Sequence, residues 1–242
     1  DEDALGVPGV VIGFCSDAPG GFSQGEIEAI GRLEAMLALA ARMTILRGLA
    51  SAIAVTYLGE TAARQVLDGA IRLDDGAFVP ATIWFADMRG STALAERLEP
   101  RAYVALLNRW FAAVAGAASE AGGEILDFIG DAVLAIFPAG KAGVEAAVRA
   151  ADRALERLED LRADPALPDE GPLAGVAIAT GDVMFGNVGI PERLSFSVIG
   201  PTVNAVARIE ALTKTLGEPV LATAAVRDVD PALWCSRGRH AL

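Results

Sequence analysis

The stretch ATIWFADMRGST, residues 81–92, decides the expected fold of the second half of the chain. Its apolar, β-branched and aromatic start predicts a buried strand that ends in a single carboxylate, Asp87. Directly afterwards, Arg89, Gly90, Ser91 and Thr92 break the pattern and open a helix, whose free backbone N–H groups can bind phosphate oxygens. An acid at a strand end is also a common turn residue, so Asp87 alone does not define a site.

A second acid stands in a similar place in ILDFIGDAVLAIF, residues 125–137. Gly130 and Asp131 interrupt two apolar runs there, which predicts two strands joined by a tight turn. If the strand ending at Asp87 lies beside this hairpin, both carboxylates lie at one end of the sheet. Hard oxygen ligands of this kind suit Mg²⁺ or Mn²⁺. A metal ion next to a phosphate-binding helix start implies a nucleoside triphosphate.

Helix-like and strand-like runs alternate through the rest of this half. The pattern predicts helices over 101–121, 140–161 and 201–214, a surface loop over 162–172 and a hairpin over 175–189. This order favours an α/β fold: an α+β sandwich of the ferredoxin-like type, with a mostly antiparallel sheet and helices on one face. In the last helix, Asn204 and Arg208 are four residues apart and share one face. Such a pair on a helix surface often has no function, although here it follows an abrupt Gly200-Pro201 start.

The first half is predicted to be mainly helical. A strand is expected over 7–17, and Ser23 with Glu26 has the spacing of a capping box. The following helix carries an apolar stripe of Ile27, Ile30, Leu33, Leu37 and Ala40. The stripe fits a dimerising signal helix and equally a helix packed on its own domain. A shorter connector helix is expected within 56–76.

Composition restricts the class of protein. The 242 residues are 53% hydrophobic and carry a formal charge of −12, which predicts a globular chain and argues against a nucleic-acid partner. Cys15 and Cys235 lie far apart in the sequence, so we expect free buried thiols in a reducing, cytoplasmic compartment. The apolar windows are shorter than the roughly 18 uninterrupted residues of a membrane span, so no membrane segment is expected. Because the chain begins at Asp1 without signal-like features, we expect it to be part of a longer protein.

Three motifs together resemble a known family. FADMRGST, FIGDAVLAIF and FSVIGPTVNAVARIEALT are similar to the three signature blocks of class III nucleotide cyclases, the adenylate and guanylate cyclase catalytic domain, over about residues 80–223. The resemblance implies a catalytic domain over 79–242 that is C-terminally truncated. More weakly, residues 1–45 resemble the end of a GAF-type sensory domain with its signalling helix, and residues 46–78 resemble the helical connector that precedes such cyclases.

The resemblance also implies roles for individual residues. Asp87 and Asp131 would bind two metal ions, Mg²⁺ or Mn²⁺, with the Met88 carbonyl as a further candidate ligand. Asn204 would hold the ribose and Arg208 the α-phosphate of ATP or GTP, which the enzyme converts to the 3′,5′-cyclic monophosphate and pyrophosphate. In this family the sites form between two catalytic domains, which implies an antiparallel homodimer.

Two departures from the family pattern leave alternatives open. The base-reading positions hold Asp127 and Ser197 in place of Lys and Asp. An acid at the first position resembles guanylate cyclases, whereas Ser at the second occurs in bacterial members that use ATP, so ATP is slightly favoured and GTP stays open. The sequence also stops before the strand pair that carries a phosphate-binding Lys. The alternatives are a cyclase-like nucleotide-binding regulatory module without turnover and a purely structural dimerisation module.

Overall fold

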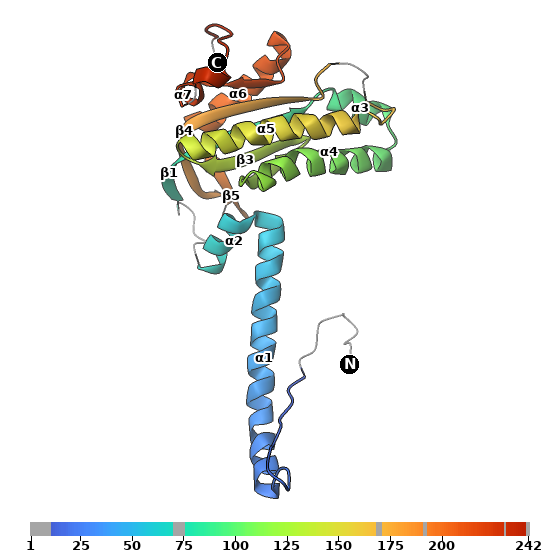
Figure 1. Cartoon of the computed structure of the whole chain (residues 1–242), viewed down its shortest axis with the longest axis vertical. Coiled ribbons are helices and arrows are strands. Elements are labelled where there is room, and N and C mark those ends of the chain that lie inside the picture. Colours follow the sequence, from blue (N-terminus) through green and yellow to red (C-terminus); the bar gives the residue numbers. More distant parts are fainter. Residues whose placement is uncertain (1–10, 70–75, 168–170, 191–192, 230, 241–242) are drawn as a thin grey trace. The chain divides into compact units, whose positions relative to one another are not determined.

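The computed structural model describes residues 11–69, 76–167, 171–190, 193–229 and 231–240 (Figure 1). The chain divides into two compact units between Tyr57 and Leu58. The first unit contains nearly all of the long helix α1 (Gln24–Leu58), which therefore continues through residue 45 without a break. The second unit contains the sheet and every other helix of the described part.

The second unit alternates helices and strands in the predicted order. Its elements are α2 (Glu60–Leu67), β1 (Gly76–Met88), α3 (Ser91–Arg97), α4 (Pro100–Glu120), β2 (Glu124–Ile129), β3 (Ala132–Pro138), α5 (Lys141–Leu161), β4 (Ala174–Ile190), β5 (Arg193–Ile199), α6 (Pro201–Leu216), β6 (Val220–Ala222), α7 (Ala224–Arg227) and a 3₁₀ turn (Pro231–Leu233). The strands follow the order β2-β3-β1-β4-β5, with β6 paired to β4. All pairs are antiparallel except the parallel β4–β6 pair, so the predicted mostly antiparallel α/β fold is confirmed.

Helices pack on both faces of the sheet, whereas the sequence led us to expect them on one. Because side chains alternate along a strand, Trp84 and Ala86 of β1 enter a core with α4 and α5, and Ile83 enters a second core with α6. Figure 1 shows α4 and α5 lying side by side along the sheet. The second core forms because Val206 and Ile209 give α6 an apolar face of its own.

The predicted hairpin over 175–189 is wrong, because β4 is one long strand. Its pairing with β1 runs without interruption from Met88↔Ala174 to Gly76↔Gly186. Gly181 and Asp182 therefore continue the strand instead of turning. The 13-residue length of β1 supplies backbone partners along this whole stretch, so a turn there would leave those groups unpaired. The hairpin forms instead between β4 and β5.

The first unit confirms the predicted capping box. The Ser23 N–H donates to Glu26 Oε2 at 2.8 Å, and the Glu26 N–H donates to Ser23 Oγ at 3.3 Å. The expected strand is not formed: residues 11–17 are not in a strand, and residues 7–10 lie outside the described residues.

Cys15 and Cys235 are free, as expected, but the expectation that they are buried is wrong, since both are exposed.

Helix α1 is long and apolar enough, by length and composition alone, to cross a membrane. None of its 35 residues is buried. The expectation that the chain has no membrane segment therefore stays a prediction.

A carboxylate of the sheet holds the start of the connector helix α2. Both the backbone N–H and the hydroxyl of Thr61 donate to Glu124, each at 2.6 Å. Glu124 thus satisfies a free N–H group in the first turn of α2 from outside the helix. Because Glu124 begins β2, this contact fixes α2 to the strand that also carries Asp127.

Candidate active site

The two predicted acids meet at one end of the sheet. Ala86 of β1 pairs with Val133 of β3, so Asp87 lies level with the β2–β3 turn that contains Asp131. Gly130 has a φ of 65°, a conformation that favours glycine and permits this tight turn. Both carboxylates are partly buried. The prediction that Asp87 and Asp131 lie side by side is confirmed.

The electrostatics of this pair suit a bound cation. Burial, and next the neighbouring Asp131, raise the pKa of Asp87 from 3.8 to about 7. Glu210 adds to this effect and Arg89 opposes it. Among the described residues, Asp131 Oδ2 is buried without a hydrogen-bond partner. A positive ion between the carboxylates would relieve both the repulsion and the unsatisfied oxygen.

The donor set fits a metal ion that is shared with a phosphate ligand. Within the described ranges, no group of three or more His, Cys, Asp or Glu side chains could hold a metal by itself. Mg²⁺ is usually bound through one or two carboxylates, with substrate phosphates and waters completing its coordination. Asp87 and Asp131 would hold such an ion, and the carbonyl of Met88 at the end of β1 is adjacent in the chain. Just beyond, Gly90 adopts a left-handed φ of 71° and α3 begins at Ser91, as predicted.

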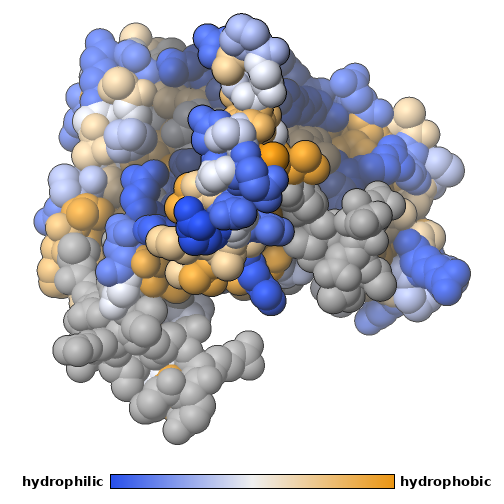
Figure 2. All heavy atoms as spheres, turned by 90° about the horizontal axis from the view of Figure 1, so that it is seen from below, coloured by the Kyte–Doolittle hydropathy of each residue, from blue (hydrophilic) through white to orange (hydrophobic). Residues whose placement is uncertain are grey.

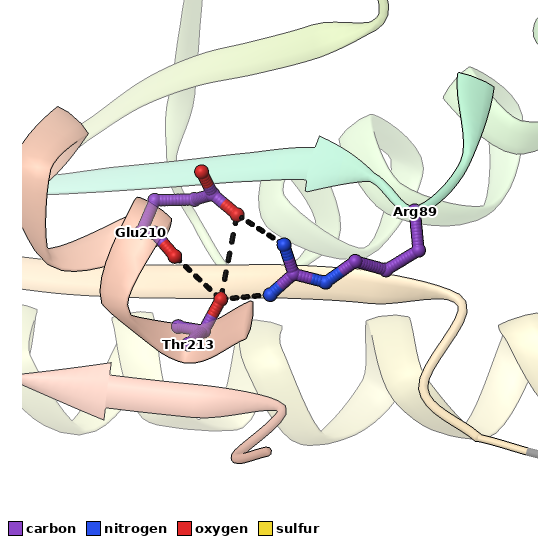
Figure 3. Close-up of polar contacts among 3 residues, drawn as sticks. All are labelled: Arg89, Glu210 and Thr213. Atoms are coloured by element: carbon purple, nitrogen blue, oxygen red, sulfur yellow. Dashed lines mark hydrogen bonds and ion pairs between the residues drawn. The ribbon is translucent and has the colours of Figure 1, made fainter. Parts of the chain in front are cut away.

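The side chain of Arg89 is engaged in a buried network (Figure 3). Arg89 Nη1 lies 3.0 Å from Glu210 Oε1, and Nη2 donates to Thr213 Oγ1. Thr213 Oγ1 in turn donates to the Glu210 carbonyl oxygen at 2.5 Å. The side chains of Arg89 and Glu210 are only 15% and 9% exposed. The guanidinium of Arg89 therefore joins the end of β1 to α6.

Sequence reasoning missed Glu210 and Thr213 because no short spacing connects them with Arg89, 121 and 124 residues earlier. Glu210 also lies near Asp131, and burial raises the pKa of Glu210 above its usual range. The network and the pair of acids thus form one polar cluster. We refer to Arg89, Glu210 and Thr213 as the β1–α6 network.

Gly175 makes room for this network, and we expect Gly175→Ala to disrupt it. Gly175 pairs with Asp87 across the strands, and an added Cβ would overlap Arg89, Glu210 and Thr213. Overpacking of a buried site typically costs about 1–3 kcal/mol. We expect the free energy of unfolding in denaturant to fall by about this amount. The control is Gly48→Ala, where the added Cβ meets open space; an equal loss in both variants would contradict this role.

Asn204 and Arg208 lie on the exposed face of α6. The buried residues of the helix, Val206, Ile209, Glu210 and Thr213, define its opposite face. Since Glu210 faces the acids, Asn204 and Arg208 point away from them within one chain. The structure therefore brings Asp87 and Asp131 together but does not bring Asn204 and Arg208 to them.

The two base-reading candidates lie on different strands. Asp127 is exposed on β2, directly after a register shift relative to β3 that starts at Ile125. Such irregularities change the direction of a side chain. Ser197 is half-buried on β5, opposite Gly186. Strands β2 and β5 also contact each other, although they stand at opposite ends of the pairing order.

The raised pKa of Asp87 predicts a pH-dependent stability in the absence of metal. Below pH 3.8, the pKa of Asp87 in the unfolded chain, the carboxyl is protonated in both the folded and the unfolded protein. Between pH 3.8 and about 7 only the folded protein retains the proton. The contribution of Asp87 to the free energy of unfolding is thus fully present at low pH and is lost as the pH rises to about 7. We expect the free energy of unfolding of metal-free protein to be lower at about pH 8 than at about pH 5. Asp87→Asn should reduce this difference; an unchanged pH profile would contradict the assignment.

Comparison with known proteins identifies chains that are similar to this one in sequence and in fold. Residues 75–226 match the family model of the adenylate and guanylate cyclase catalytic domain. An adenylate cyclase of Anabaena cylindrica is 38% identical over 152 residues, which are 60% of this chain and 30% of that protein. The structure of a bacterial light-regulated adenylyl cyclase is 27% identical with a TM-score of 0.67, covering 91% of this chain and 63% of that one. The guanylyl cyclase Cya2 is 28% identical with a TM-score of 0.54, covering 64% and 79%.

The matched region is only part of its relatives. The chain spans less than a third of the length of the first curated relatives that it matches, 30% and 29% respectively.

Proposed function

Because this chain belongs to the adenylate and guanylate cyclase catalytic domain family, we propose that it converts a purine nucleoside triphosphate to the 3′,5′-cyclic monophosphate and pyrophosphate. The observation that carries the proposal is the pair of half-buried acids, Asp87 and Asp131, with an unsatisfied buried oxygen and a strongly raised pKa. Perturbed carboxylates of this kind gather at functional sites. If these residues had only a structural role, nothing would offset the energetic cost of their mutual repulsion.

Each chemical requirement of the reaction can be assigned to a residue of this chain. When bound, two Mg²⁺ or Mn²⁺ ions supply positive charge that favours the attacking 3′-oxygen and the leaving pyrophosphate. Asp87 and Asp131 would hold these ions. The Asn204 amide can donate to and accept from the ribose, which orients the sugar for in-line attack. The Arg208 guanidinium stabilises the charge that develops on the α-phosphate.

The reaction needs a second copy of the chain, because α6 directs Asn204 and Arg208 away from the acids of their own chain. A two-fold dimer would bring the acids of one protomer to the Asn and Arg of its partner, giving two equivalent sites. Exposed apolar side chains at the ends of β2, β4 and β5 support an interface on this unit: Phe128, Ile129, Val188, Ile190 and Ile199. Figure 2 shows, for one view of the molecule, that hydrophobic side chains reach the surface among hydrophilic ones.

Product identification tests the proposal. The chain is incubated with Mn²⁺ and either ATP or GTP, and the products are separated and identified by mass spectrometry. We expect a 3′,5′-cyclic monophosphate and pyrophosphate in equal amounts. Nucleotide binding without any product at saturating metal would favour the regulatory module instead.

ATP is slightly favoured as substrate and GTP stays open. The similarity to an adenylate cyclase of Anabaena cylindrica supports ATP. Asp127 supports GTP, because a carboxylate can accept from N1–H and N2–H₂ of guanine, whereas the N1 lone pair of adenine would oppose it. The hydroxyl of Ser197 can donate to guanine O6 or to a ring nitrogen of either base.

We therefore expect Asp127→Lys to raise the ratio of kcat/KM for ATP over GTP. The exchange replaces an acceptor by a donor, and one charged hydrogen bond is worth about 1.5–3 kcal/mol, or about ten- to a hundredfold. The measurement is kcat/KM for both nucleotides in each protein. Asp127→Asn is the control, since it keeps the size of the side chain while removing its charge. An unchanged ratio in Asp127→Lys would show that Asp127 does not read the base.

A further inference from the structure

The end of β1, which carries the acid Asp87, is held by the sheet itself. The strand lies between β3 and β4, and Met88 pairs with Ala174 of β4. Directly after the strand, the Arg89 N–H donates to the Leu173 carbonyl oxygen at 2.9 Å. The backbone at this end of β1 is therefore fixed independently of the β1–α6 network.

Helix α6 lies on the sheet through contacts of a different kind. Val206 and Ile209 pack into the second core, and at the start of the helix Thr202 Oγ1 donates to the Asp182 carbonyl oxygen at 3.0 Å. Apolar contacts are non-directional, so they keep α6 on the sheet without fixing its rotation or its position along its axis. Towards the end of the helix, directional contacts come from the β1–α6 network.

The guanidinium of Arg89 contacts α6 at two points (Figure 3). Nη1 lies 3.0 Å from Glu210 Oε1, and Nη2 donates to Thr213 Oγ1. Glu210 and Thr213 are three residues apart, so they share one face of the helix, and both are buried. Because the guanidinium is planar and rigid, two contacts with it set both the rotation and the axial position of this part of α6.

We propose that Arg89 and Thr213 are positioning residues, which orient α6 so that Arg208 on its exposed face meets the α-phosphate in the site shared with the partner. The inference rests on the proposed function, which assigns Arg208 to the charge that develops on that phosphate. Arg208 is only two residues from Glu210, so a rotation of α6 at the network moves the Arg208 side chain. A displacement of about 1 Å at a catalytic group can cost about a hundredfold in rate.

An electrostatic role of Arg89 is the competing explanation, because its charge lowers the pKa of Asp87. Two substitutions distinguish charge from position. Arg89→Lys keeps the positive charge but lacks the planar pair of donors. Thr213→Val removes a hydroxyl and changes no charge. The two variants remove the same contact from opposite sides.

Steady-state kinetics in Mn²⁺ tests the role. We expect Arg89→Lys and Thr213→Val each to lower kcat at least about tenfold while KM stays within about twofold, since Arg208 acts on charge that is present only in the transition state. The double variant should be no slower than either single one, because both lose one shared contact. Thr213→Ser retains the hydroxyl and should retain kcat.

Two matched exchanges control for the loss of a hydroxyl as such. Thr82→Val removes a fully buried hydroxyl from β1, and Thr215→Val makes the same exchange at an exposed position of α6. Both should keep a normal kcat. Normal kcat in Arg89→Lys, additive losses in the double variant, or an equal loss in Thr82→Val would each overturn the proposal.

Mixing of variants identifies the half of the site in which Arg89 acts. With Asp87→Asn, one site of the mixed dimer receives both defects and the other receives neither, so Arg89→Lys should regain about a quarter of the wild-type specific activity. With Arg208→Ala, both defects affect the α6 half, and no activity should return. The reverse pattern would assign Arg89 to the acids and overturn the proposal.

Amide hydrogen exchange of the full chain tests the inference without turnover. Arg89→Lys changes no residue of α6, yet we expect exchange over residues 210–216 to be at least about fivefold faster, because the end of α6 loses a fixed contact. Thr82→Val should leave this segment unchanged. Unchanged protection of α6 in Arg89→Lys would overturn the proposal. An inactive wild-type chain would instead refute the proposed function, and hydrogen exchange would still decide whether the network holds α6.

Discussion

Asp87→Asn and Asp131→Asn are each expected to lower kcat by at least about 10²–10³-fold, the loss that follows removal of one preorganised electrostatic contact. Each exchange keeps the size of the side chain and removes a negative charge from the half-buried pair. If the pair binds two divalent ions as proposed, the remaining carboxylate would not hold them by itself, and the attacking and leaving oxygens would lose their counter-charge. Steady-state kinetics at saturating Mn²⁺ measures the effect.

Measurements of stability distinguish this loss of kcat from misfolding of the variants. Because burial and repulsion from Asp131 raise the pKa of Asp87 to about 7, removal of the charge should leave metal-free stability near neutral pH equal or higher. The stabilisation by added Mn²⁺ should shrink in the same variants, since an ion that binds only the folded state stabilises it. Near-normal kcat in either variant, with its fold intact, would refute the metal assignment.

Mixing two inactive variants is expected to restore activity. In an Asp87→Asn/Arg208→Ala heterodimer, one site receives both defects and the other receives neither. At equal amounts with free exchange, half of the dimers are mixed and each has one intact site of two, so specific activity should reach about a quarter of wild type. The physical reason is the opposite orientation of Glu210 and Arg208 on α6, which prevents one chain from completing a site.

A matched mixture controls for nonspecific effects. Asp87→Asn with Asp131→Asn combines two defects from the same half of the site, so every site of the heterodimer keeps one defect and no activity should return. Rescue in this control, or none in the first mixture after subunit exchange has been verified by mass, would exclude a site shared between protomers.

The sequence by itself determined what depends on near neighbours in the chain. The meeting of Asp87 and Asp131 was predictable because a strand end and a tight turn at Gly130 are both encoded locally, and one antiparallel pairing aligns them. The capping box at Ser23 was predictable for the same reason. The expected helices over 101–121, 140–161 and 201–214 also formed, because their apolar period and start signals act within one element.

Only the tertiary structure decided what depends on distant partners. The backbone N–H of Arg89 was expected to be free for a phosphate, but it donates to the Leu173 carbonyl oxygen at 2.9 Å. A carboxylate 121 residues away binds the Arg89 guanidinium, and Gly175 leaves the space for that contact. The apparent hairpin over 175–189 became one strand because β1 offers backbone partners along its length. On α1, periodicity revealed an apolar stripe at Ile30 and Leu37 but not that Ile12 and Phe14 lie against it. Burial is a property of packing against residues from elsewhere in the chain, and a local pattern states which side chains can be buried, not what covers them.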